Sequence, residues 1–289
     1  MEMAYRLLAI NIDAFAGQNK GRITRSTKDA IHYARKKKVS VCFYSNRELP
    51  FVKKTAKSLI PESCLIAHNG AYIASELDKP VYIQRVNEES THEMVQFLES
   101  FDCRITLSTE KFSVSNKGRM PATLVKRSMW QRTQKFLYSQ YFVNSLSDHL
   151  FEEPISPLSI QVTFFKFGER DEVWQALKNM FNEVSFLKKG TDQIEITAFG
   201  VTKWNSILYL AERMMIRRSE IAVIGVDEDD EEVVREAGIG IVMGDAPENV
   251  KQAADWITRT KEDDGIAYVI KELLRHQRRS AEEEVNKFD

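Results

Sequence analysis

The chain has 289 residues, 43% of them hydrophobic and 29% charged, with a formal net charge of −1 from 41 basic and 42 acidic side chains. This composition predicts a globular protein of one large or two ordinary domains, and the charge balance argues against a nucleic-acid or anionic-membrane partner. No apolar run approaches the roughly 20 residues that span a bilayer, and the first residues lack a signal-peptide pattern. Three widely spaced cysteines predict no disulfide framework, so we expect a cytoplasmic protein.

The first 84 residues alternate between apolar runs and amphipathic stretches, which is typical of strands that alternate with helices. The apolar runs are continuous, as expected for parallel strands covered on both faces. In chain order the predicted elements are a strand over 5–12, a helix from Thr24 over 26–37, a strand over 39–45, a helix over 50–59, and two short strands around Asn69-Gly70.

The pattern changes after about residue 85. A helix over 89–100 precedes segments with a period of two, at 104–115 and 159–167, which predict an antiparallel sheet. The stretch 118–157 predicts only a mixture of helix and loop. We therefore expect an inserted α+β domain over 85–190.

Strands and helices alternate again after Gly190. The predicted strands are 193–198, 221–225, 239–244 and 256–260, and the predicted helices are 203–216, 230–237, one from Pro247 and one from Gly265. Such repeats predict an α/β fold with a doubly wound parallel sheet, which binds ligands beyond the carboxyl ends of its strands.

Four loops after these predicted strands carry polar side chains. They are 11–15 (NIDAF), 45–47 (SNR), 200–204 (GVTKW) and 225–233 (GVDEDDEEV). One such loop is weak support for a site, because helix N-termini favour Ser, Asp and Asn. Four loops at one sheet edge, with a lysine and an acidic cluster among them, favour an anion or metal site.

Three segments then carry a resemblance to a known family: 27–47 (TKDAIHYARKKKVSVCFYSNR), 67–73 (AHNGAYI) and 236–270 (EAGIGIVMGDAPENVKQAADWITRTKEDDGIAYVI). The chain resembles the Cof-type branch of the haloacid dehalogenase-like (HAD) phosphatases almost end to end. The resemblance implies a Rossmann-like core domain over 1–84 and 191–289, and it makes the 85–190 insert the cap domain that selects the substrate.

The family uses a DxDGT motif with a nucleophilic and an acid/base aspartate, a phosphate-binding Ser or Thr, a lysine, and a GDGxND motif that helps bind Mg²⁺. An aspartyl-phosphate intermediate needs an anionic attacking oxygen and cations around the phosphoryl group. The matching positions are Asp13 for the acid/base, Ser45, Asn46 and Arg47 for phosphate, Lys203 for catalysis and phosphate, and Asp230 for the last motif aspartate.

The departures from the motifs affect the positions that carry out the reaction in the family. Asn11 stands at the nucleophile position, and a neutral amide does not readily attack phosphorus. Val226 replaces a metal-binding aspartate, while Ala14, Phe15 and Trp204 replace small residues. Loss of the nucleophile in another hydrolase class costs on the order of 10⁶ in turnover. We therefore expect Mg²⁺ binding to be weak or absent and catalysis to be impaired.

Several alternatives stay open. A metal, if bound, would use Asn11, Asp13 and either Asp227 or Asp230, with Asp227 as a substitute ligand. The acids from Asp229 to Glu232 also suit the first turn of a helix, and Ser45 with Asn46 can cap one.

The leading hypothesis is a disabled phosphatase that binds a phosphorylated small molecule or a phosphate anion. The rivals are a slow Mg²⁺-dependent phosphatase acting on sugar phosphates or nucleotides and a non-enzymatic scaffold. The sequence gives no indication of the oligomeric state.

Overall fold

The computed structural model describes residues 5–15, 23–117, 139–166 and 168–275. The chain divides into two compact units. The first unit comprises Met1–Asn46, Val52–Val81 and Thr202–Asp289, and the second comprises Arg47–Phe51 and Tyr82–Val201.

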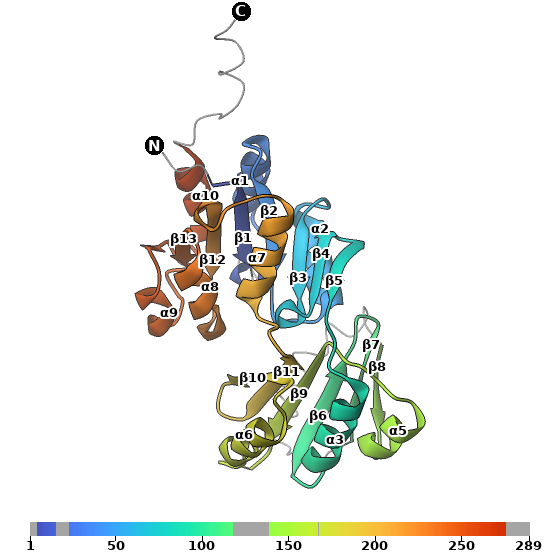
Figure 1. Cartoon of the computed structure of the whole chain (residues 1–289). Coiled ribbons are helices and arrows are strands. Elements are labelled where there is room, and N and C mark those ends of the chain that lie inside the picture. Colours follow the sequence, from blue (N-terminus) through green and yellow to red (C-terminus); the bar gives the residue numbers. More distant parts are fainter. Residues whose placement is uncertain (1–4, 16–22, 118–138, 167, 276–289) are drawn as a thin grey trace, which may run out of the picture. The chain divides into compact units, whose positions relative to one another are not determined.

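The first unit is built on an eight-stranded sheet with the order β14-β13-β12-β1-β2-β3-β4-β5 (Figure 1). Its strands are β1 (Leu7–Asn11), β2 (Ser40–Tyr44), β3 (Cys64–Ala67), β4 (Tyr72–Glu76), β5 (Lys79–Ile83), β12 (Ile221–Gly225), β13 (Ile239–Val242) and β14 (Trp256–Ile257). The helices of this unit are α1 (Arg25–Lys36), α2 (Leu49–Leu59, whose first three residues group with the second unit), α7 (Lys203–Arg213), α8 (Glu231–Glu236), α9 (Glu248–Gln252) and α10 (Gly265–Arg275).

Both faces of the central strands are buried, which explains why they read as unbroken apolar runs. Leu7 and Ala9 of β1 pack in a cluster with Trp204 of α7 and Val233 of α8. Leu8, on the opposite face of β1, is also buried. The helices α1 and α10 lie side by side (Figure 1).

Parallel pairing brings the carboxyl ends of three strands to one edge of the sheet. β1 is the central strand and pairs in parallel with β12 on one side and with β2 on the other. The chain therefore leaves the sheet at Asn11, Tyr44 and Gly225 along the same edge. This edge carries the polar loops that the sequence singled out.

The second unit contains a six-stranded sheet with the order β10-β11-β9-β6-β7-β8. Its strands are β6 (Cys103–Ser108), β7 (Phe112–Asn116), β8 (Ser139–Val143), β9 (Ser159–Phe164), β10 (Val184–Lys189) and β11 (Gln193–Ala198). Alternate residues such as Ile105, Val114 and Ile160 form one apolar core with α3 (Glu88–Leu98), α5 (Leu146–Glu152) and α6 (Glu169–Met180).

The α/β class, the parallel core and the α+β insert are confirmed. The helix predicted from Thr24 is α1, and the Thr24 side chain caps it by accepting from the Thr27 N–H. The strands around Asn69-Gly70 are β3 and β4, which pair antiparallel. β5, α6 and β10 were not foreseen. Within the predicted stretch 118–157, residues 118–138 lie outside the described part.

One boundary needs correction. The sequence placed 193–198 in the core, because a strand followed by a helix begins the run of strand–helix repeats after Gly190. The structure pairs this strand, β11, antiparallel with β9 and β10, so it belongs to the second unit. The second unit therefore extends to Val201 and not to residue 190.

Among the described residues, no helix has the length and apolar character needed to cross a membrane. The three cysteines are buried with free thiols.

The turn between β3 and β4 depends on a glycine. Gly70 has a φ of +113°, and a Cβ there would lie 2.3 Å from the Ser206 Oγ and 2.6 Å from the Thr202 carbonyl oxygen. We predict that Gly70→Ala lowers the free energy of unfolding by about 2–4 kcal/mol, since backbone strain and overpacking add. Urea unfolding followed by circular dichroism measures the change.

Gly200→Ala is the matched control. Its φ of +77° carries similar strain, but no atom lies within 4 Å of the added Cβ. We expect it to cost only about 1 kcal/mol. Equal losses for the two variants would contradict the contact between the turn and α7.

Candidate functional site

The candidate site is formed by two loops that leave neighbouring strands at the same edge. β1 ends at Asn11 and continues into a 3₁₀ turn, η1 (Ile12–Phe15). β12 ends at Gly225 and leads into a second 3₁₀ turn, η6 (Glu228–Asp230). Because β1 and β12 are parallel neighbours, Asn11 meets the residues that follow Gly225.

Asp230 lies at the centre of the site and is completely buried. Its Oδ2 accepts hydrogen bonds from the Val226 N–H at 2.7 Å, the Asp227 N–H at 3.1 Å and the Asn11 amide nitrogen at 2.6 Å. Its Oδ1 accepts from the Lys203 ammonium at 2.7 Å. Four donors thus satisfy this carboxylate, so Asp230 fixes the loop and also belongs to the site.

Lys203 supplies the positive charge. Its side chain is 2% exposed and forms ion pairs with Asp230 at 2.7 Å and with Asp229 at 2.9 Å. Burial by itself would lower the pKa of this ammonium, but attraction from Asp230 and Asp229 outweighs burial and raises the pKa above its usual value. The lysine therefore stays charged, and the anion that the sequence predicted for it is a pair of aspartates.

Asn11 is held in one orientation. Its Oδ1 accepts from the Asp13 N–H at 2.9 Å, while its Nδ2 donates to Asp230 and, at 3.3 Å, to the Asp227 Oδ2. Exchange of the amide oxygen and nitrogen would set oxygen against carboxylate and N–H against N–H, so the hydrogen bonds decide the assignment. The atoms that face the carboxylates are donors.

Two other predicted residues also contact the aspartates. The Ser45 hydroxyl donates to the Asp13 Oδ2 at 3.2 Å, and the Asn46 amide donates to the Asp229 Oδ2 at 2.8 Å. Arg47 differs, since its guanidinium lies 4.3 Å from the centroid of the Phe51 ring and the residue groups with the second unit. The structure thus brings together Asn11, Asp13, Ser45, Asn46, Lys203, Asp227 and Asp230.

Sequence reasoning missed Tyr44, which lies under the site. This buried residue ends β2, its hydroxyl donates to the Ile224 carbonyl at 3.2 Å, and the Lys203 ammonium lies 5.8 Å from its ring centroid. Burial, followed by the charge of Asp230, raises the pKa of the phenol well above its ordinary value. No sequence signal singled it out, because its aromatic ring fits the apolar run of β2.

The family resemblance implies Mg²⁺, and the donor set does not fit it. Magnesium needs oxygen ligands with free lone pairs, but the Asp230 carboxylate already accepts from four donors. Asn11 presents N–H groups, and not its oxygen, to the carboxylates of Asp230 and Asp227. Val226 contributes only a buried apolar side chain. Within the described ranges, no group of three or more His, Cys, Asp or Glu side chains is arranged to hold a metal.

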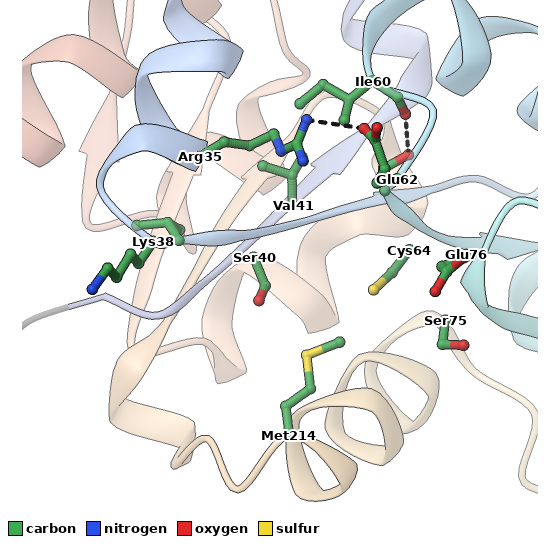
Figure 2. Close-up of a pocket in the computed structure, with 12 residues that line it drawn as sticks. Arg35, Lys38, Ser40, Val41, Ile60, Glu62, Cys64, Ser75, Glu76 and Met214 are labelled. Carbon is green, nitrogen blue, oxygen red and sulfur yellow. Dashed lines mark hydrogen bonds and ion pairs between the residues drawn. The ribbon is translucent and has the colours of Figure 1, made fainter.

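A separate cavity of about 450 Å³ lies in the first unit and contains none of the predicted site residues. Ser40 and Cys64, which begin β2 and β3, line it together with Met214, and the Arg35–Glu62 ion pair closes one side (Figure 2). It therefore lies at the amino ends of the strands, opposite to the edge described above.

Comparison with known proteins agrees with this architecture. A family model described as haloacid dehalogenase-like hydrolase matches residues 9–270. The stress response protein YhaX of Bacillus subtilis is 35% identical over 280 residues, which is 96% of either chain. Phosphatase YwpJ of the same organism is 23% identical over 287 residues, covering 93% of this chain and 100% of YwpJ.

A solved haloacid dehalogenase-like hydrolase from B. subtilis has the same fold. Its TM-score is 0.80 at 20% identity, with 93% of this chain and 100% of that chain covered.

The raised pKa of the Asp227 carboxyl gives a prediction for the pH dependence of stability. Burial, then the charges of Asp230, Asp13 and Asp229, raise its pKa from 3.8 to about 6. The folded state therefore binds a proton on the Asp227 carboxyl more tightly than the unfolded state does. The contribution of this protonated carboxyl to the free energy of unfolding is lost as the pH rises from about 4 to about 6. We predict that Asp227→Asn is more stable than wild type at pH 7.5 by on the order of 1 kcal/mol, since solvent screens part of the effect.

Urea unfolding at pH 5 and pH 7.5 measures this difference. Asp29→Asn, which changes an exposed carboxylate on α1, should leave the pH dependence as in wild type. An Asp227→Asn profile parallel to wild type would contradict the raised pKa.

The buried ion pairs of Lys203 give a second prediction. Lys203→Met leaves Asp229 and Asp230 without their counter-ion, and loss of one partner of a buried pair costs about 3–5 kcal/mol. Lys53→Met removes an exposed pair with Asp78 and should cost less than about 1 kcal/mol. Chemical denaturation of both variants tests this, and similar losses would mean that the Lys203 contacts contribute little.

Proposed function

The chain belongs to the Cof-type haloacid dehalogenase-like hydrolases, and we propose that it is a catalytically impaired member that binds a phosphate-containing small molecule without turning it over. In this proposal the second unit is the cap that selects the ligand, and the cytoplasm is its location.

The observation that carries the proposal is the state of Asn11. The family resemblance puts a nucleophilic aspartate at this position, whereas Asn11 offers a neutral amide. Its only oxygen accepts from the Asp13 N–H, and its nitrogen donates to Asp230 and Asp227. An amide held in this way is a poor nucleophile, and a covalent phosphoryl intermediate at residue 11 is not expected.

Ligand binding is supported by donors from two other segments. The Ser45 hydroxyl, the Asn46 amide and the Lys203 ammonium all reach the same group of aspartates. A phosphate group accepts hydrogen bonds of the same kind as a carboxylate, so it can replace these partners. Because each donor is already satisfied, an incoming phosphate competes with a carboxylate, and we expect weak affinity.

The names of the relatives are consistent with a role outside turnover. YhaX, at 35% identity, is named for a stress response. YwpJ, which is named as a phosphatase, is 23% identical. A binding or regulatory role is therefore our proposal for this chain.

Turnover is tested with purified protein, Mg²⁺ and a panel of phosphomonoesters that includes sugar phosphates and nucleotides. We predict release of phosphate no faster than from Asp13→Ala, because neither an anionic nucleophile nor a metal site is available. Clear activity in wild type that Asp13→Ala abolishes would refute the proposal and favour the slow phosphatase.

Binding is tested by titration of inorganic phosphate, observed as chemical-shift changes in amide NMR spectra. We predict saturable changes around Ser45 and Lys203 that weaken in Ser45→Ala, which removes one donor. Ser75→Ala is the matched control, since Ser75 lies in the cavity at the opposite edge of the sheet. Shifts that do not saturate, or that Ser45→Ala leaves unchanged, would favour the scaffold.

A further inference from the structure

The aspartates of the site find their hydrogen-bond and ion-pair partners within the chain. Four carboxylates, Asp13, Asp227, Asp229 and Asp230, are linked through hydrogen bonds or ion pairs to Asn11, Ser45, Asn46 and Lys203. Only one of these partners, Lys203, carries a full positive charge. It lies on the two carboxylates of the η6 turn, and the most deeply buried one, Asp230, is 2.7 Å away.

The amide nitrogen of Asn11 lies between two of the carboxylates. Its Nδ2 lies 2.6 Å from the Asp230 Oδ2 and 3.3 Å from the Asp227 Oδ2. A divalent cation between these carboxylates would meet the two N–H bonds of the Asn11 amide, whose hydrogens carry partial positive charge. Rotation of the amide would bring its oxygen round only by breaking three hydrogen bonds at once.

We propose that Lys203 and Asn11 together replace the divalent cation as the internal counter-ion and bridge of this site. The Lys203 ammonium supplies the charge, and the Asn11 amide joins the β1 loop to the β12 loop. Val226, whose buried side chain carries no oxygen ligand, adds no carboxylate at its own position. The inference deepens the proposed function, on which it rests for the identity of the site.

The proposal has a direct consequence for stability. A counter-ion that belongs to the chain is present at every cation concentration, so the folded state gains nothing from Mg²⁺ and loses nothing to a chelator. A ligand stabilises a protein only when it binds the native state in preference to the unfolded state. The wild-type protein should therefore have the same melting temperature with and without the metal.

The experiment measures melting temperature in MgCl₂, in EDTA and in NaCl of matched ionic strength. We expect wild type to show no Mg²⁺ effect beyond that of NaCl. Asn11→Asp with Val226→Asp restores two carboxylates and removes the amide donor, so this double variant should gain about 5 °C at saturating Mg²⁺. Asn182→Asp, which adds a carboxylate at an exposed loop position of the second unit, should behave as wild type.

Two outcomes would overturn the inference: a Mg²⁺-specific rise in the wild-type melting temperature, or a folded double variant that does not respond to Mg²⁺. Should the double variant fail to fold, calorimetric titration of millimolar Mg²⁺ into wild type decides, and saturable heat overturns the proposal. Failure here is distinct from failure of the proposed function. Wild type that binds Mg²⁺ without turnover refutes only the inference, and turnover in EDTA refutes only the proposed function.

Discussion

The site depends on one buried carboxylate. Asp230 is inaccessible to water, and an isolated charge there would be prohibitively costly. Its four donors come from three segments of the chain: the end of β1, the two residues between β12 and η6, and the first residue of α7. The same contacts that make the charge tolerable also fix the distances between those segments. Electrostatic satisfaction of Asp230 therefore sets the geometry of the whole edge.

The sequence could predict this edge because its signals are local. Apolar runs that end in Asn11, Ser45 and Gly225 predict parallel strands, and parallel strands deliver their carboxyl ends together. The family resemblance added Lys203, the first residue of α7, to the residues expected at this edge. What the sequence could not show is which donor meets which acceptor. The contact of Asn11 with Asp230 spans 219 residues, and no periodicity encodes it.

Misplacement of β11 has a physical cause. Residues 193–198 alternate strictly between polar and apolar side chains, which favours an antiparallel strand, but the helix α7 that follows them gave the segment the order of a strand–helix unit. The order of elements along the chain outweighed the alternation within the strand, although alternation is typical of antiparallel sheets. Tyr44 was missed for another reason. Its aromatic ring fits an apolar strand, and only the fold reveals that its hydroxyl ends beside the Lys203–Asp230 pair.

The carboxylates around position 11 bear on which residue that position can hold. If the chain binds no cation, an aspartate at position 11 would lie against Asp230 and Asp227 with nothing to offset it, and like charges at such distances repel strongly in a buried site. A neutral amide relieves this repulsion and adds two hydrogen bonds. An apolar side chain at position 226 is compatible with this arrangement, because the hydrogen bond from Val226 to Asp230 comes from the backbone N–H. Within the proposed function, the amide at position 11 and the apolar side chain at position 226 therefore both suit a site that holds no cation.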